Sequence, residues 1–209
     1  MRLAFLWTSL LASLALGACG GSNAARSGDA AGPFSVGGTT GGGGGAGGGA
    51  GGNPSVQKQA FVSYAMVQGD VGLAAADAAC NEDGALWFSG RNFVAFLSTS
   101  TQSALARIGD GPWWVGQSRL GRPADLASNT LGTALNRSPT GSVFATGEYV
   151  WTGTASGGIV AAAQTCADWT TKSNTVTGQL GQIGYNLEKW TASTIDTCDH
   201  EGHLYCFER

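Results

Sequence analysis

The segment that decides the fold spans residues 70–82 and reads DVGLAAADAACNE. Leu73, Ala76 and Cys80 recur in it at intervals of three and four residues, the spacing that places side chains on one face of an α-helix. The segment therefore predicts a helix that buries Cys80 and directs it toward the rest of the domain.

The ends of this helix and the segments around it follow from turn residues and short apolar runs. Asp70 can cap the start of the helix and Gly84 can end it, and a second helix is expected to end before Gly109. Strands are predicted from β-branched and aromatic content. The expected elements are a second helix at 101–108, strands at 61–66, 112–116, 149–152 and 204–208, and a buried strand or short helix at 92–98.

Polar and turn-forming residues dominate 117–165, where we expect long irregular loops that carry function or are held by cross-links.

Five cysteines divide the chain into an anchor and a domain. Cys19 lies near the N-terminus, whereas Cys80, Cys166, Cys198 and Cys206 all lie in the last 130 residues. Four cysteines in an exported domain are expected to form two disulfides, although their positions alone allow three pairings. A nested pairing would join the first helix to the last strand and close a smaller loop inside.

The first 19 residues resemble a bacterial lipoprotein signal. Arg2 and an apolar run over 3–16 precede LGAC at residues 16–19, a lipobox in which the thiol of Cys19 receives a diacylglycerol. The run is too short for a permanent membrane span but fits a signal peptide. The alternatives are an ordinary signal peptide with a chance cysteine, or a free thiol. We expect residues 1–18 to be removed and the chain to be exported and anchored through lipid on Cys19.

Residues 19–56 are predicted to be a flexible tether between the lipidated cysteine and a single domain at 57–209. Glycine occupies 12 of the 16 positions from 37 to 52, a composition typical of a flexible coil.

Loss of Arg2 with the signal peptide changes the formal net charge of the chain from −3 to −4. No cluster of lysine or arginine of the kind that binds phosphates occurs, so nucleic acid is not an expected partner.

Several motifs together resemble the bacterial endostatin-like domains, which are similar to the wider C-type-lectin-like fold. They include the leptospiral endostatin-like outer-membrane lipoproteins. The resemblance covers nearly all of residues 60–209. The motifs are GLAAADAAC at 72–80, AFLSTS at 95–100, GPW at 111–113, VWTGT at 150–154, CADWT at 166–170 and LYCFE at 204–208.

This resemblance implies an α+β domain in which two helices flank a twisted antiparallel sheet, with long loops on one side. It implies nested disulfides, Cys80 with Cys206 and Cys166 with Cys198. It further implies a binding module rather than an enzyme, since the leptospiral relatives bind host matrix and complement proteins.

Calcium-dependent sugar binding is not expected. Sugar-binding C-type lectins use a Glu-Pro-Asn or Gln-Pro-Asp loop and a Trp-Asn-Asp strand, and this chain has neither motif. In place of the second motif it has Trp190-Thr191-Ala192.

The densest polar cluster lies near the C-terminus, and its side chains could hold zinc if the segment formed a turn. A turn that faces water would contain the same polar residues without binding a metal, so neither metal nor cofactor is predicted. The candidates for a metal are Asp196, Asp199, His200, Glu201 and His203.

Tryptophans supply the candidate ligand contacts. Trp113, Trp151 and Trp169 lie beside apolar residues in the motifs above, so we expect them in the core. Exposed indoles could instead stack on sugar rings or anchor a protein interface. Trp87 could be buried or exposed, and Trp114 and Trp190 are the predicted ligand-binding indoles, beside the irregular surface of 117–165.

Hydrolysis is not predicted. The sequence GQSRL at 116–120 lacks the final glycine of a nucleophile elbow, and the domain cysteines are assigned to cross-links. Glu148 and Asp168 could form the pair of carboxylates that a glycosidase uses, but their charge is the sole feature that supports this role.

Two functions remain: an adhesin-like module that binds protein or glycan without calcium, and a structural envelope component without a soluble ligand. The long tether favours the first, because reach helps capture. Since Gly20 is not the aspartate associated with inner-membrane retention, we expect an outer-membrane location. The oligomeric state is left open.

Replacement of Cys19 by alanine is expected to abolish lipid attachment, because no other thiol lies at the signal junction. Metabolic labelling with a palmitate analogue measures this directly. Continued labelling of the Cys19→Ala variant would show that this anchor is wrong.

Overall fold

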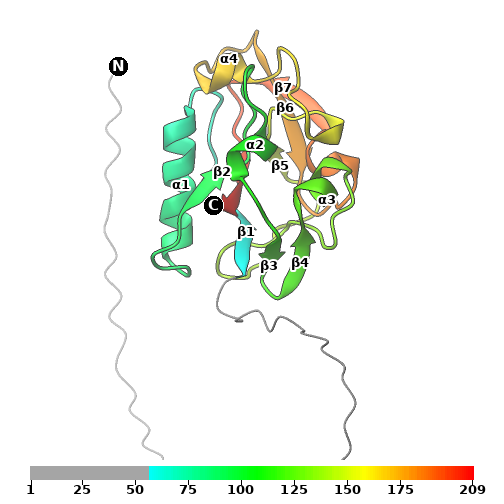
Figure 1. Cartoon of the computed structure of the whole chain (residues 1–209). Helices are drawn as coiled ribbons and strands as arrows, with labels where there is room; N and C mark the ends of the chain where they lie inside the picture. The colour runs from blue at the N-terminus through cyan, green and yellow to red at the C-terminus, as the bar shows by residue number, and fades with distance from the viewer. Residues whose placement is uncertain (1–56) are drawn as a thin grey trace, which may run out of the picture. The chain divides into compact units, whose positions relative to one another are not determined.

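The computed structural model describes residues 57–209, which form an α+β fold built on a mixed sheet (Figure 1). The strands are β1 (Lys58–Val62), β2 (Phe93–Ala95), β3 (Trp113–Val115), β4 (Ser118–Gly121), β5 (Tyr149–Trp151), β6 (Thr177–Gln182), β7 (Thr194–Thr197) and β8 (His203–Glu208). The helices are α1 (Leu73–Ala85), α2 (Ala104–Ile108), α3 (Pro123–Ala127) and α4 (Cys166–Trp169), with short 3₁₀ turns η1 (Ser156–Gly158) and η2 (Glu188–Trp190). The signal, lipidation and tether predictions for residues 1–56 lie outside the described residues.

The sheet has the strand order β4-β3-β1-β8-β5-β6-β7, and β2 pairs with β8 beside this path. The expectation of an antiparallel sheet is wrong in two places, because β1 pairs with β3 and β5 pairs with β8 in parallel. The chain reaches β3 from β1 through α1, β2 and α2, a crossover of the length that parallel pairing requires.

Strand β8 lies between two hydrophobic clusters. Tyr205 and Phe207 belong to one cluster, and Leu204 and Cys206 belong to the other. Successive side chains of a strand point to opposite faces, so a strand buried on both faces needs an uninterrupted apolar run. The run at 204–207 therefore reflects a central position in the core.

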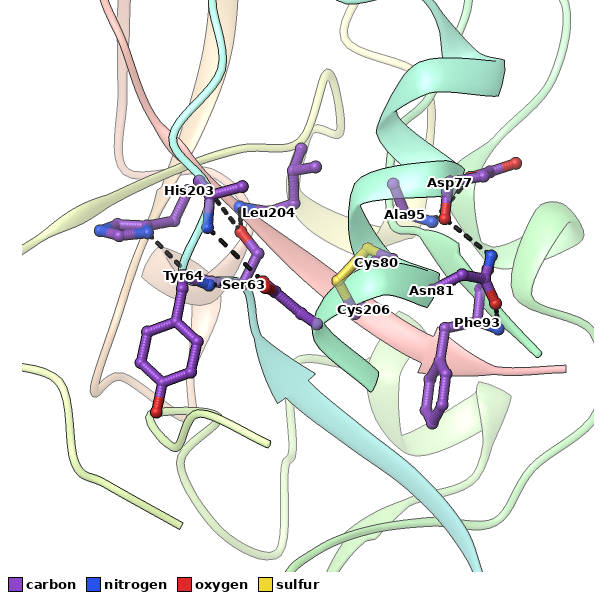
Figure 2. The surroundings of a disulfide bond; sticks show 12 residues. Ser63, Tyr64, Asp77, Cys80, Asn81, Phe93, Ala95, His203, Leu204 and Cys206 are labelled. Atoms are coloured by element: carbon purple, nitrogen blue, oxygen red, sulfur yellow. Dashed lines mark hydrogen bonds between the residues drawn. A yellow bond between two sulfur atoms is a disulfide. The ribbon is translucent and has the colours of Figure 1, made fainter. Parts of the chain in front are cut away.

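The structure confirms the nested disulfides, Cys80 with Cys206 and Cys166 with Cys198. The first joins the buried face of α1 to β8 (Figure 2). The second joins the turn at α4 to the segment that follows β7. Both pairs are fully buried, so each cross-link lies within the core.

Polar side chains of α1 pair with the backbone of β2 (Figure 2). Asn81 accepts from the N–H of Phe93 at 2.8 Å and donates to its carbonyl at 2.8 Å. Asp77 accepts from the N–H of Ala95 at 2.8 Å and pairs with Arg107 at 2.9 Å. The helix thus satisfies the backbone groups that an edge strand would otherwise leave unpaired.

Both predicted ends of α1 are wrong. The helix begins after Gly72, which occupies the N-cap position without a side-chain cap, so Asp70 does not cap it. Gly84 does not end the helix but lies inside it, where it is buried. A methyl group on Gly84 would lie 2.6 Å from Cδ2 of Phe93, so close packing against β2 requires glycine here.

Four of the six indoles in the described residues are fully buried. Trp113, Trp151 and Trp169 lie in the core as predicted. Trp190 is also fully buried, packed against Phe96 at 5.0 Å between ring centroids, so the expectation of an exposed ligand-binding indole at this position is wrong. Trp114 is half-buried, and Trp87 is 61% exposed.

The region expected to be irregular contains more structure than its composition predicts. Strand β4 and helix α3 lie within 117–165, together with the predicted strand β5. Pro123 begins α3 at the first helical position. A backbone N–H at this position makes no hydrogen bond within the helix, so proline, which lacks the N–H, costs none there. No helix within residues 57–209 is long and apolar enough to cross a membrane.

Replacement of Gly84 by alanine is expected to destabilise the domain. Alanine normally stabilises a helix interior by about 1 kcal/mol relative to glycine. Contact with Phe93 should outweigh this gain, since overpacking costs about 1–3 kcal/mol. Urea denaturation measures the difference in the free energy of unfolding.

Two variants control for helix propensity. Ala78→Gly, on the exposed face in the middle of α1, should lose about 1 kcal/mol. In a Phe93→Leu background, which removes the ring atoms near Gly84, Gly84→Ala should cost less. Equal costs in both backgrounds would contradict the packing argument.

Candidate functional site

A groove of about 530 Å³ lies beside β4, within the region that sequence analysis singled out for binding. We call it the β4 groove. It is lined by Ser118, Arg119, Leu120, Gly121, Asp125, Thr130, Gly132 and Thr133. The lining combines hydroxyl groups, backbone groups and one charged pair, so it offers hydrogen-bond donors and acceptors in a concave surface.

One wall of the β4 groove is the hairpin of β3 and β4, which lie side by side near α3 in Figure 1. Gly116 has a φ of 61° in the tight turn between the two strands. The facing wall is the segment 130–133, whose Gly132 N–H donates to the carbonyl of Leu120 at 2.8 Å. A Cβ atom on Gly132 would lie 2.7 Å from the carbonyl oxygen of Arg119, so this close approach requires glycine.

Arg119 and Asp125 form the charged pair of the groove, with 3.5 Å between Nη2 and Oδ2. Both side chains are substantially exposed, so the pair contributes little to stability and both groups can reach a ligand. Asp125 is oriented by the backbone N–H of Arg122, which donates to Oδ2 at 2.8 Å. This hydrogen bond closes the first turn of α3 and fixes the carboxylate at the groove.

Trp114 lies next to the β4 groove. It pairs with Arg119 across the β3–β4 ladder, and directly paired residues of antiparallel strands project from the same face. Its half-buried indole therefore lies beside the Arg119 side chain. Of the two predicted ligand-binding indoles, Trp114 retains the exposed surface needed for contact.

Trp190 supports the β4 groove from inside the protein. Its indole N–H donates to Oδ1 of Asn129 at 3.0 Å, immediately before the wall segment 130–133. Asn129 has a φ of 56°, a left-handed conformation that asparagine tolerates better than most residues. The backbone N–H of Leu131 also donates to Asn186 at 3.2 Å. Trp190 thus positions the groove wall.

Sequence analysis did not single out Arg119, Asp125 or Thr130. No local motif marks them, because they meet through strand pairing and the turn after α3. The one available signal was the concentration of polar and turn residues over 117–165.

The five candidate metal ligands do not converge. His200 pairs with Asp196 at 2.8 Å at the surface, whereas His203 is buried and its Nε2 lies 3.3 Å from Glu148. The hydrogen bond to Asp196 raises the pKa of His200, and a hydrogen bond from Thr197 lowers the pKa of Asp199. Within residues 57–209, no three His, Cys, Asp or Glu side chains are grouped to hold a metal ion.

Glu148 and Asp168 line different hollows. Glu148 lines one with His203, and Asp168 lines another with Ser100 and Thr165. The Asp168 carboxylate accepts from the hydroxyl of Ser100 at 2.7 Å and from its N–H at 2.6 Å. These bonds lower the pKa of Asp168, so it is ionised at neutral pH and cannot serve there as a general acid.

The backbone around Asp168 is left-handed throughout α4. All four residues from Cys166 to Trp169 have φ between 49° and 65°. Such a conformation costs about 1–2 kcal/mol for each residue with a side chain. The disulfide at Cys166 and the Trp169 indole, which donates to Ser98 at 2.8 Å, hold this turn in place. Asp168 is therefore assigned to local structure.

No protein-family model matches this chain, and no curated protein matches it in sequence.

Replacement of Asp168 by asparagine tests this structural assignment. Asparagine tolerates the left-handed conformation but lacks the charge that strengthens the bonds from Ser100. The free energy of unfolding at neutral pH should fall by about 1–2 kcal/mol, as urea denaturation can measure.

The difference from wild type should depend on pH. Because folding lowers the pKa of Asp168, its contribution is complete above the unfolded value of about 3.9 and is lost as the pH falls through the lower folded value. Asp110→Asn, at an exposed site, is the control. A difference that persists unchanged in strong acid would contradict the assignment.

Proposed function

We propose that this protein is a lipid-anchored component of the bacterial cell envelope that presents a non-catalytic, adhesin-like binding module. The β4 groove is the proposed ligand site, and protein or glycan is the proposed ligand. The tether at 19–56 would give the module reach from the membrane, which suits capture of a partner outside the envelope.

The observation that carries this proposal is the β4 groove itself. It joins hydroxyl groups, an accessible arginine–aspartate pair and a neighbouring indole, the combination that recognises the hydroxyl groups and apolar faces of sugars or the polar side chains of a protein. Its walls are held by a strand ladder and by the buried Trp190. Preorganisation of this kind reduces the entropic cost of binding.

The C-type-lectin-like assignment belongs to this proposal. The α+β sheet, the nested disulfides and the positions of the motifs at 72–80, 150–154 and 204–208 support it. If the domain belongs to this family, it is expected to bind a ligand.

Binding is proposed to need neither calcium nor catalysis. Asp125 is the carboxylate of the groove lining, and Oδ2 already accepts a backbone hydrogen bond. Calcium prefers six to eight oxygen ligands, with several carboxylates among them. The hydroxyl, amide and guanidinium groups can bind a neutral or polar ligand without an ion.

An array of glycans and extracellular matrix proteins, probed with the mature chain, tests the proposal. Binding to at least one class is expected, and it should be retained in EDTA. Loss on chelation with recovery on addition of calcium or zinc would contradict the calcium-independent mode and direct attention to residues 196–203.

Trp114→Ala should weaken binding to the ligand found on the array by at least about tenfold, because an aromatic anchor is removed. Trp87→Ala is the matched control, since it removes an exposed indole from the segment between α1 and β2. Equal losses in the two variants would contradict a site at the β4 groove.

A further inference from the structure

The hollow that contains Glu148 and His203 has a volume of about 360 Å³ and lies where β5 meets the start of β8. We call it the β8 hollow. It is lined by Met66, Glu148, Tyr149, Glu201 and His203. Met66 is 49% exposed and Tyr149 is 44% exposed, so two apolar side chains form open walls beside two glutamates. No lysine or arginine lies in this lining.

Strand pairing assembles the β8 hollow from distant segments. Parallel pairing of β5 with β8 aligns Val150 with His203, which brings Glu148 and Tyr149 to the start of β8. The N–H of Val67 donates to the carbonyl of Gly202 at 2.9 Å, and the N–H of Gly202 donates to the carbonyl of Val67 at 3.0 Å. This antiparallel bridge places Met66 opposite His203. The lining is therefore set by backbone hydrogen bonds.

His203 is the buried member of the lining, with 9% of its side chain exposed. Its ring packs edge-on against Phe144 at 4.9 Å. Its Nδ1 lies 2.9 Å from the carbonyl oxygen of Ser63, to which it must donate because a carbonyl accepts only; Figure 2 shows this contact.

The remaining ring nitrogen of His203 faces Glu148. With the proton on Nδ1, neutral His203 presents a lone pair at Nε2, and Oε2 of Glu148 lies 3.3 Å from it. Two acceptors then lie side by side in the hollow without a donor between them. The contact needs a proton, supplied either by a charged imidazole or by a bound group that carries N–H donors.

We propose that the β8 hollow binds the cationic side chain of a lysine or arginine from a partner protein. The ammonium or guanidinium group would donate to Glu148 and to Nε2 of His203, with Glu201 as a second carboxylate nearby. The aliphatic part of the side chain would pack on Met66, and the charge would lie near the ring of Tyr149, where a cation–π contact is favourable.

This proposal does not depend on the β4 groove, because β3 and β1 separate β4 from β8 in the strand order. A neutral ligand is disfavoured because the two carboxylates would lose hydration without gaining an opposite charge. An anion is disfavoured by repulsion from both carboxylates. A cation with an apolar chain matches both the charge and the walls of the hollow.

Met66 provides a direct reporter for the test. The chain contains two methionines, Met1 and Met66. In the full chain labelled with ¹³C at the methionine methyl groups, a Met66→Leu variant assigns the Met66 signal. The probes are the Nα-acetyl, N-methylamide derivatives of lysine and arginine, and the norleucine derivative is the uncharged control. At least one cationic probe should shift the Met66 signal saturably at millimolar concentration, and the norleucine probe should not.

Glu148→Gln should weaken the affinity of that probe about tenfold, because a charge-assisted hydrogen bond is replaced by a neutral one. Glu188→Gln, at an exposed site on η2, should leave the affinity unchanged. If Glu148→Gln does not fold, Glu201→Gln provides the same comparison. The proposal is wrong if neither cationic probe shifts Met66, if norleucine produces the same shift, or if Glu188→Gln weakens binding as much as the variants in the hollow.

Discussion

Strand β8 is the element on which the other parts of the domain depend. It pairs with β1, β2 and β5, and Cys206 joins it to α1 through Cys80. Its alternating side chains enter both hydrophobic clusters, so each face of the strand is part of a core. Because β8 lies at the C-terminus and pairs with β1, the first strand of the domain, the core depends on contacts between distant parts of the chain.

The positions of the two proposed sites follow from this arrangement. The β4 groove lies at one edge of the sheet, where β4 has no outer strand partner and the segment 130–133 covers it instead. The β8 hollow lies where β5 meets the start of β8. In both places polar side chains rest on strands fixed by the core, so loops can vary in chemistry while the scaffold holds their shape. The buried Trp190 holds Asn129 beside the wall of the β4 groove, so an indole inside the core can shape a proposed surface site.

Local patterns identified most of the elements but not their ends. The spacing of Ala76 and Cys80 correctly predicted the buried face of α1, and the runs at 112–116, 149–152 and 204–208 each contain a strand. The cap proposed at Asp70 failed because the helix begins after Gly72, and the end proposed at Gly84 failed because this glycine packs against Phe93 inside the helix. Composition likewise concealed β4 and α3, because each is only four or five residues long and carries a single buried leucine, Leu120 or Leu126.

The sequence by itself determined the helix that carries Cys80, the apolar strand at the C-terminus and the candidate region at 117–165. Periodicity, apolar runs and turn residues are local properties that can be read along the chain. Tertiary structure decided which cysteines pair, that Trp190 is buried while Trp114 is partly exposed, and that Glu148 meets His203. These outcomes depend on strand order and register, which bring residues far apart in the chain into contact and which no local pattern encodes.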